Sequence, residues 1–308
     1  MVRESTDVLH PPGTDPDWSE SFYFNFYDRK SGILAFMRIG ITPNKGKKNF
    51  FCGLIMPDGE FLVNKSELGL LGEPLEAGPL RFEKIAPERL WSLSFDGHLL
   101  RQEPGAPGGR AKRVQFKILF ESLNEIFDYR ECVSGRKEIV SGRVASEHLE
   151  QFGRATGSMS VGGSGFEISA LGERDHSWGV RDWNAPKMWV WLTCQFSEEH
   201  ALNVTKLVMG DEEVDAGFVH KRGRNLPVIS AEIETRYSEG GVPSSLKLRL
   251  KDGEGRLHDI DATIEKMATL PFRSEDGKHL SILYEPLARY EQGGETGYGV
   301  AEYLVKKF

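Results

Sequence analysis

Apolar and polar residues alternate along most of this chain, in short segments separated by Gly, Asp, Asn and Pro. In one segment Phe22, Phe24 and Phe26 would share one face of a strand, because successive side chains of a β-strand point to opposite faces. Nearly the whole chain is therefore predicted to be β-structure. The same pattern predicts further strands at residues 34–41, 90–95, 114–120, 138–148, 151–161, 166–171, 188–196, 201–209, 215–220, 229–237, 244–250, 257–264, 279–287 and 297–305.

Turn residues between these segments indicate hairpins. Residues 57–59, Pro-Asp-Gly, separate apolar segments at residues 50–56 and 60–63, which is typical of a β-hairpin with a tight turn. Many strands with evenly spaced turns predict antiparallel sheets that are closed into barrels or stacked as sandwiches. We expect a domain boundary near residue 155, because each half of the chain then holds enough strands for a barrel of its own.

The composition narrows the classes of partner. A formal net charge of -7 argues against a nucleic-acid or anionic-membrane partner, since both usually need a basic face. No stretch approaches the about 18 apolar residues of a membrane span. Three widely spaced cysteines do not make a disulfide framework, and the first residues lack the basic and apolar regions of a signal peptide. We therefore expect a cytoplasmic protein without integral membrane association.

Residues 172–183, GERDHSWGVRDW, concentrate ionisable and aromatic side chains. They follow one predicted strand and precede another, so we expect a loop at the rim of a sheet, where functional residues are common. Beside the ring of Trp178, the carboxyl group of Asp175 would have a raised pKa and could donate a proton. The neighbouring imidazole of His176 could hold or relay that proton.

The same residues have a purely structural interpretation. Asp175 could pair with Arg174 or Arg181 and fix the loop, while Trp178 and Trp183 fill the core. Charged loop residues are structural more often than catalytic, whereas ionisable groups among aromatic rings are common at functional sites. The sequence leaves both interpretations open.

Residues 147–151, Glu-His-Leu-Glu-Gln, form a second polar group. In an extended strand His148 and Glu150 lie on one face, so both would project into a barrel lumen if that face lined it. Two buried polar groups need partners, which the segment around Asp175 and His176 could supply. The alternative is an exposed strand edge, which the composition alone favours.

A third group lies in the glycine-rich segment at residues 293–303, GGETGYGVAEY. Glu302 could face inward there, with Tyr298 nearby. The alternative, a hairpin with a surface glutamate, is favoured. The segment has neither the lysine nor the following helix of a phosphate-binding loop.

The sequence lacks the motifs of several common kinds of functional site. No His-x-x-x-His or Cys-x-x-Cys pair is present, so we predict no metal site. Neither Gly-x-Ser-x-Gly nor a strand–Gly-x-Gly-x-x-Gly–helix unit is present, so serine hydrolase and dinucleotide-binding functions have no support. We expect chemistry that needs no cofactor.

Residues 172–183 resemble the signature of the carotenoid 1,2-hydratase/AttH-like superfamily. Residues 18–24 (WSESFYF), 147–151 (EHLEQ) and 297–302 (GYGVAE) are similar to an uncharacterised bacterial branch of it. The resemblance covers both halves of the chain and implies two consecutive lipocalin-like β-barrel domains.

The resemblance also implies a kind of chemistry. The superfamily includes hydratases that add water to an isolated alkene of a terpenoid, cyclases and pericyclases that act on polyenes, and members without known activity. In the hydratases a carboxylic acid protonates the alkene and water captures the cation. Asp175 matches the aspartate of the shared Asp-x-Ser-Trp-Gly pattern, and Trp178 could stabilise the cation through its ring. The position of His176 is often not histidine in the hydratases.

We therefore predict two lipocalin-like domains, residues 1–155 and 156–308, with the Arg-Asp-His-Ser-Trp-Gly loop in the second and a site near their junction. The expected function is cofactor-independent acid–base catalysis by a hydratase, isomerase or cyclase on an apolar unsaturated, terpenoid- or polyene-like small molecule. The alternative is a non-catalytic carrier of an apolar ligand, and a homodimer is compatible with either. The candidate catalytic residues are Asp175, His176, His148, Glu150 and Glu302, and the candidate ligand-binding residues are Trp178, Trp183, Trp191, Tyr298 and Arg181.

Overall fold

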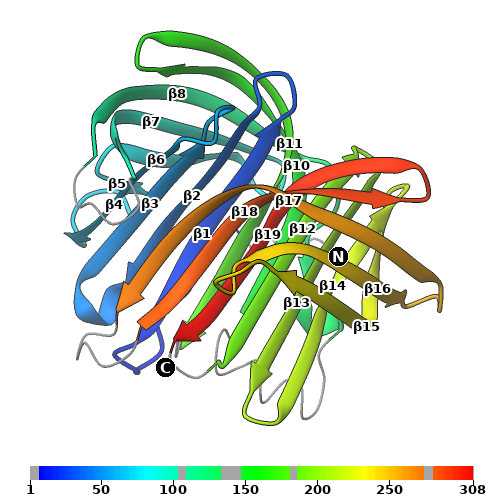
Figure 1. Ribbon diagram of the computed structural model, residues 1–308. Coiled ribbons are helices and arrows are strands. Elements are labelled where there is room, and N and C mark those ends of the chain that lie inside the picture. The colour runs from blue at the N-terminus through cyan, green and yellow to red at the C-terminus, as the bar shows by residue number, and fades with distance from the viewer. Residues whose placement is uncertain (1–6, 103–108, 133–146, 181–185, 274–279, 308) are drawn as a thin grey trace. The chain divides into compact units, whose positions relative to one another are not determined.

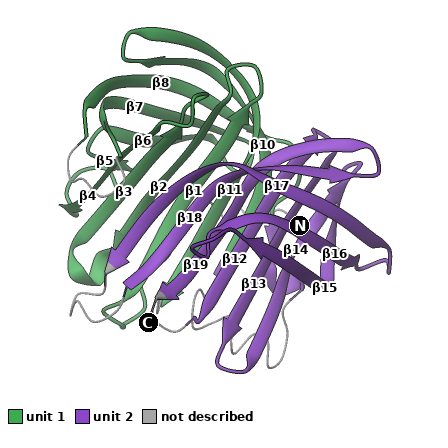
Figure 2. Ribbon diagram, in the orientation of Figure 1, with its two compact units in different colours: residues 1–126, 148–181 green, residues 127–147, 182–308 purple. Residues whose placement is uncertain are grey.

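A computed structural model describes residues 7–102, 109–132, 147–180, 186–273 and 280–307. These residues form β-strands and two short 3-10 helices (Figure 1). None of the described helices is long and apolar enough to cross a membrane. The chain divides into two compact units, one of residues 1–126 and 148–181 and one of residues 127–147 and 182–308 (Figure 2).

The first unit is a closed antiparallel barrel with a short sheet extension. Its strands follow the order β4-β3-β2-β1-β11-β10-β8-β7-β6-β5, and a further pairing of β4 with β7 closes the ring. The strands are β1 (Trp18–Asp28), β2 (Ile33–Thr42), β3 (Lys47–Ile55), β4 (Phe61–Gly69), β5 (Glu76–Ala77), β6 (Leu80–Ala86), β7 (Leu90–Arg101), β8 (Ala111–Ser122), β10 (Glu147–Val161) and β11 (Ser164–Val180), with the 3-10 helix η1 (Pro43–Lys45) after β2.

Every second residue of β1 points into the apolar lumen of this barrel. Phe22, Phe24 and Phe26 belong to one buried cluster and are at most 1% exposed, which confirms their predicted common face. The ring of Phe24 lies edge-on to Trp91 and Phe120, with centroids 5.6 and 5.2 Å apart. Such aromatic pairs add to the free energy gained by burial itself. The aromatic residues of β1 thus hold that strand in the barrel wall.

The second unit is a closed antiparallel barrel of eight strands that follow one another in sequence. A short segment before β10 packs on it: the ring of Phe127 stacks on Phe218 at 4.5 Å, and Tyr129 shares a hydrogen bond of 2.9 Å with Thr205. The strands are β12 (Met188–Ser197), β13 (His200–Met209), β14 (Glu212–Lys221), β15 (Arg224–Tyr237), β16 (Pro243–Asp252), β17 (Leu257–Arg273), β18 (Leu280–Gln292) and β19 (Glu295–Lys307), and the added segment contains β9 (Phe127–Asp128) and η2 (Tyr129–Glu131).

The hairpin predicted around residues 57–59 is present between β3 and β4. Ile55 lies opposite Phe61, and the backbone N–H of Met56 donates to the carbonyl of Glu60 at 2.8 Å. Gly59 adopts a φ of 86°, a left-handed conformation that favours glycine. The all-β fold class and this local hairpin thus follow from the sequence pattern.

The segment expected to be a loop is a strand instead. β11 runs to Val180 and pairs with β1 from Tyr27↔Leu171 to Trp18↔Val180. The expected boundary at residue 155 falls inside β10, because the β10–β11 hairpin fills the place between β8 and β1 in the first barrel. Residues 164–180 therefore belong to the first unit rather than to the C-terminal half of the chain.

Gly172 marks a close approach between β1 and β11. A Cβ atom there would lie 1.9 Å from the backbone oxygen of Asn25, whereas a Cβ at Gly165 of the same strand would meet nothing within 4 Å. Gly172→Ala should therefore lower the free energy of unfolding by about 1–3 kcal/mol, the usual cost of overpacking. Gly165→Ala should change it by less than about 0.5 kcal/mol. Chemical denaturation measures both, and equal effects would contradict this account of the strand pair.

Candidate functional site

The alternation of side chains along β11 separates two adjacent candidate residues. His176 stacks on Phe22 in the lumen at a centroid distance of 3.9 Å. Asp175 points to the opposite face of the strand, where it contacts His148. Trp178 lies with His176 on the lumen side, at a centroid distance of 4.8 Å. The expected arrangement, with Asp175 beside Trp178 and a proton relay through His176, is therefore wrong, because neighbouring strand residues face apart.

Asp175 instead forms a compact group with two residues of β10, here called the His148 cluster: His148, Glu150 and Asp175. His148 Nε2 lies 2.9 Å from Glu150 Oε1 and also contacts Asp175 Oδ2. Glu150 is fully buried, and the side chains of His148 and Asp175 are 9% and 15% exposed. The structure thus brings together three of the five candidate catalytic residues. They lie on the face opposite to the apolar lumen.

The charges within the His148 cluster determine where its proton resides. Burial lowers the pKa of His148, but the carboxylate of Asp175, followed by that of Glu150, more than offsets this effect and raises the pKa to about 10. Ser177 donates a hydrogen bond of 2.9 Å to Asp175 Oδ1, which fixes that carboxylate. At neutral pH the cluster therefore holds an imidazolium between two carboxylates.

A second group of ionisable residues lies on the lumen side and is here called the Glu20 cluster: His10, Glu20 and His176. Glu20 Oε1 lies 2.7 Å from His10 Nδ1 and 2.9 Å from His176 Nε2. The ring of His10 stacks on Trp178 at 3.7 Å. Burial lowers the pKa of His176, although Glu20 opposes this change. His176 is therefore a neutral imidazole near pH 7, unlike His148.

Arg174 has a partner other than the one expected for it. Its guanidinium donates to Asp7 Oδ1 at 2.8 Å and to Gln151 Oε1 at 2.7 Å. Arg174 and Asp7 are 2% and 3% exposed, so this is a buried ion pair. The structural interpretation in which Asp175 pairs with Arg174 is therefore wrong. The other proposed partner, Arg181, lies outside the described residues, as does Trp183.

The remaining candidates lie in the second unit. Trp191 of β12 is opposite Glu302 of β19, and Tyr298 is opposite Gln195. Glu302 interacts with Glu285 of β18, a residue that is 3% exposed. Burial, and then the charge and hydrogen bond of Glu302, raise the pKa of Glu285 well above its ordinary value. This carboxyl pair retains a proton at a higher pH than an ordinary glutamate.

Sequence reasoning missed His10, Glu20, Asp7 and Glu285. Only Glu20 left a usable signal, because the alternation that puts Phe22 on the core face puts Glu20 there as well. A carboxylate on an apolar strand face needs a partner, so a buried cation or histidine could have been expected. The partners of Glu285 and Asp7 depend on the register and packing of distant strands.

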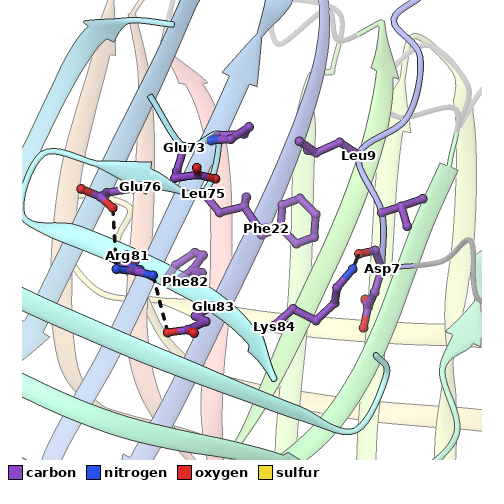
Figure 3. Close-up of a pocket in the computed structure, with 12 residues that line it drawn as sticks. Asp7, Leu9, Phe22, Glu73, Leu75, Glu76, Arg81, Phe82, Glu83 and Lys84 are labelled. Carbon is purple, nitrogen blue, oxygen red and sulfur yellow. Dashed lines mark hydrogen bonds and ion pairs between the residues drawn. The ribbon is translucent and has the colours of Figure 1, made fainter. Parts of the chain in front are cut away.

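The first unit also contains a pocket with a volume of about 520 Å³ (Figure 3). Leu9, Phe22 and Phe82 give it apolar walls, and Asp7 and Lys84 lie side by side at one edge, where the Lys84 ammonium donates to the Asp7 carbonyl. Six of its twelve lining residues are charged, namely Asp7, Glu73, Glu76, Arg81, Glu83 and Lys84, so the pocket would suit a ligand that carries polar groups beside an apolar part. The pocket is adjacent to the Glu20 cluster, since Phe22 stacks on His176.

Both clusters bring three donor atoms within 4.8 Å of one another, close enough to hold a metal ion. They differ in their chemistry. In the His148 cluster the raised pKa places a proton on the nitrogen that faces both carboxylates. In the Glu20 cluster two imidazoles meet one carboxylate, a donor set that suits borderline transition metals.

The pKa of His148 leads to a prediction about stability. Because the pKa rises from 6.5 to about 10 on folding, the native state binds more protons than the unfolded state between these values. The stabilisation is complete below pH 6.5 and is lost as the pH rises towards 10. Over this range the free energy of unfolding should fall up to about 1.4 kcal/mol per pH unit more steeply than in His148→Gln. Denaturation at pH 7, 8 and 9 measures both slopes, with the exposed His98→Gln as control; parallel slopes would refute this charge assignment.

Glu285 gives a prediction of the same kind in the second unit. Its raised pKa means that the native state keeps a proton above pH 4.5 and loses stability as the pH rises. Glu285→Gln, a neutral isostere, should be more stable than the parent protein at pH 8, with little difference near pH 4. Thermal unfolding across this range tests the sign, with the exposed Glu291→Gln as control. A variant that is less stable at pH 8 would show that Glu285 is a paired carboxylate.

Comparison with solved structures places the fold among known proteins. CghA, determined with Sch210972, has a TM-score of 0.60 at 10% identity over 94% of this chain and 89% of that chain. Kievitone hydratase from Nectria haematococca has a TM-score of 0.59 at 11% identity over 93% and 88%. A protein of Nitrosomonas europaea, provisionally described as AttH, has a TM-score of 0.59 at 11% identity over 99% and 98%.

These similarities confirm the predicted two-domain lipocalin-like fold. At such low identities they concern the fold alone. A search of curated protein sequences found no match. A family model covers residues 3–307, and the protein therefore belongs to the family described as a domain of unknown function, DUF7064.

Proposed function

We propose that the protein is an acid–base enzyme that moves protons to and from an apolar, unsaturated small molecule, as a hydratase, isomerase or cyclase does. One observation carries the proposal: the buried imidazole of His148 contacts the carboxylates of both Asp175 and Glu150, which raise its pKa to about 10. Charged groups are costly to bury, and ionisable clusters with strongly shifted pKa values are concentrated at functional sites. The proton-transfer group consists of side chains alone and needs no cofactor.

The pKa of His148 limits the reactions that this group can support. An imidazolium with a pKa of about 10 is too weak an acid to protonate an isolated alkene carbon. When a carboxylate of the cluster takes the proton from the carbon next to a carbonyl group, His148 can donate its own proton to the oxygen anion that forms, or stabilise that anion by a hydrogen bond. We therefore propose a substrate whose double bond is conjugated to a carbonyl. Asp175 then serves to hold and orient His148 rather than to give up a proton of its own.

An isolated alkene would require a neutral carboxylic acid as the donor. Glu285 has this character, because burial and the neighbouring Glu302 raise its pKa. Proton donation from this pair is the second route to the same reaction class. The two routes differ in the residue whose removal stops proton transfer, and matched variants of Asp175 and Glu285 can therefore separate them.

The fold analogy supports this reaction class without fixing the substrate. Kievitone hydratase is a hydratase by name and has the same fold at 11% identity. The signature at residues 172–183 gives the same indication. Because one fold can host unrelated functions, the proposal rests on the His148 cluster and takes only support from the analogy.

A non-catalytic carrier of an apolar ligand is the second candidate. The pocket of about 520 Å³ favours it, because Leu9, Phe22 and Phe82 form an apolar part of its wall that a small molecule could contact. In a carrier the His148 cluster would only stabilise the β10–β11 hairpin. The two candidates make opposite predictions for variants that leave the fold intact.

Deuterium exchange provides the test. Native mass spectrometry of gently purified protein would first give the chemical class of any retained ligand. Compounds of that class, or a panel of conjugated enones and dienones, are then incubated with the protein in D₂O. The parent protein should introduce deuterium at carbon. Asp175→Asn removes the charge that orients His148 and keeps it protonated, so it should reduce the rate about 100-fold, the lower end of the usual contribution of a positioned acid. Asp96→Asn is the matched control, because its side chain is 63% exposed.

The possible results separate the proposals. Loss of exchange in Asp175→Asn, with circular dichroism and ligand retention unchanged, supports the His148 route. Loss of exchange in Glu285→Gln alone would identify the pair of Glu285 and Glu302 as the proton donor. Ligand retention without protein-dependent exchange contradicts the proposed enzyme and favours the carrier. Full exchange in both variants contradicts the assignment of proton transfer to the His148 cluster and to the carboxyl pair.

A further inference from the structure

We infer that the Glu20 cluster binds a divalent transition-metal ion of the zinc class through His10, Glu20 and His176. This inference is independent of the proposed proton-transfer function, which uses residues on the other face of β11. Its basis is the meeting of two imidazole nitrogens and one carboxylate within 4.8 Å.

The geometry of the cluster is close to that of a metal-binding site. Zinc takes imidazole nitrogens and carboxylate oxygens at about 2.0–2.2 Å, so the ligand atoms of a tetrahedral site lie about 3.3 Å apart. Glu20 Oε1 lies 2.7 Å from His10 Nδ1 and 2.9 Å from His176 Nε2, so a small rotation of the carboxylate would open the space for an ion. The ion would replace the protons that now bridge these atoms. Two histidines and one carboxylate also leave a coordination position for water or another ligand.

The surroundings hold both imidazoles in the required orientation. Trp178 stacks on His10 with an interplanar angle of 10° and Phe22 stacks on His176 with one of 19°. The backbone N–H of His10 donates to Glu20 Oε2 at 3.0 Å, which orients the carboxylate from its other side. Hydrogen bonds of this kind orient metal ligands, and their loss commonly changes metal affinity 10–100-fold.

The cluster also has a means of access. Glu20 and His176 are 2% and 0% exposed, but the side chain of His10 is 19% exposed. The pocket of about 520 Å³ is lined by Leu9, the chain neighbour of His10, and by Phe22, the ring that stacks on His176. A bound ion would therefore lie beside a cavity, where its open position could take water or an oxygen donor of a small molecule.

Cobalt(II) serves as the probe, because its visible absorption reports coordination directly. The full chain is stripped with a chelator, titrated with Co²⁺ and then with Zn²⁺, while elemental analysis is made on the protein as purified. We expect saturation at one equivalent, a visible spectrum of four- or five-coordinate cobalt, and its loss when Zn²⁺ is added. Glu20→Gln and His176→Gln should each weaken binding at least about tenfold.

Two controls make the result specific. His98→Gln removes an exposed histidine and should bind as the parent protein does. Asp175→Asn alters the other cluster and should also leave the cobalt spectrum unchanged, so the metal site and the proposed function can fail separately. Circular dichroism shows whether each variant is folded, and His10→Gln offers a less buried position if a core variant unfolds.

Two outcomes would overturn the inference. The first is that the folded parent protein does not bind one equivalent of cobalt. The hydrogen bonds of the Glu20 cluster would then only hold the residues before β1 against the barrel. The second is binding that disappears in Asp175→Asn or His98→Gln but persists in Glu20→Gln and His176→Gln.

Discussion

The pairing of β1 with β11 is the constraint on which both clusters depend. Because side chains alternate along a paired strand, Asp175 must face away from the barrel lumen when His176 faces into it. A shift of one residue in this register would turn Asp175 into the apolar lumen and His176 out of it, so each side chain would lose the partners that it has now. One strand thus contributes to two separate ionisable groups, one around His148 and one around Glu20, in which His148 is protonated and His176 is neutral at neutral pH.

The energetics of these groups explain why such a strand is stable. A buried ionised side chain is costly unless opposite charge and hydrogen bonds compensate it. Arg174 is compensated by Asp7 and Gln151, and His148 by Asp175 and Glu150. Removing one member leaves its partner buried with an uncompensated charge, which typically costs about 3–5 kcal/mol. The apolar lumen contributed by the alternating residues of β1 provides the stability that offsets these polar groups.

Strands with alternating apolar and polar residues could be predicted from the sequence, whereas the polar strand β11 could not. Alternation in β1 and the turn at residues 57–59 are local features, and both are confirmed. His148 and Glu150 share a face and meet Asp175, as strand parity and the need of buried polar groups for partners suggested. That face lies opposite the barrel lumen rather than in it, and the exposed strand edge that the composition favoured is wrong, because both residues are buried. The sequence did not indicate that residues 172–180 are a strand, because a strand with polar groups buried on both faces lacks the usual alternation. The partner of Arg174 could not be predicted, since Asp7 lies 167 residues away in the sequence.

The central claim is that β11 separates a charged histidine from a neutral one. Heteronuclear NMR of the ring nitrogens in ¹⁵N-histidine-labelled protein at pH 8, assigned with single-histidine variants, tests it most directly. The account predicts that both ring nitrogens of His148 are protonated at that pH, while His176 shows the unequal nitrogen shifts of a neutral ring. A neutral His148 at pH 8 would contradict the account, because the two carboxylates beside it would then not hold the proton on which the proposed chemistry depends.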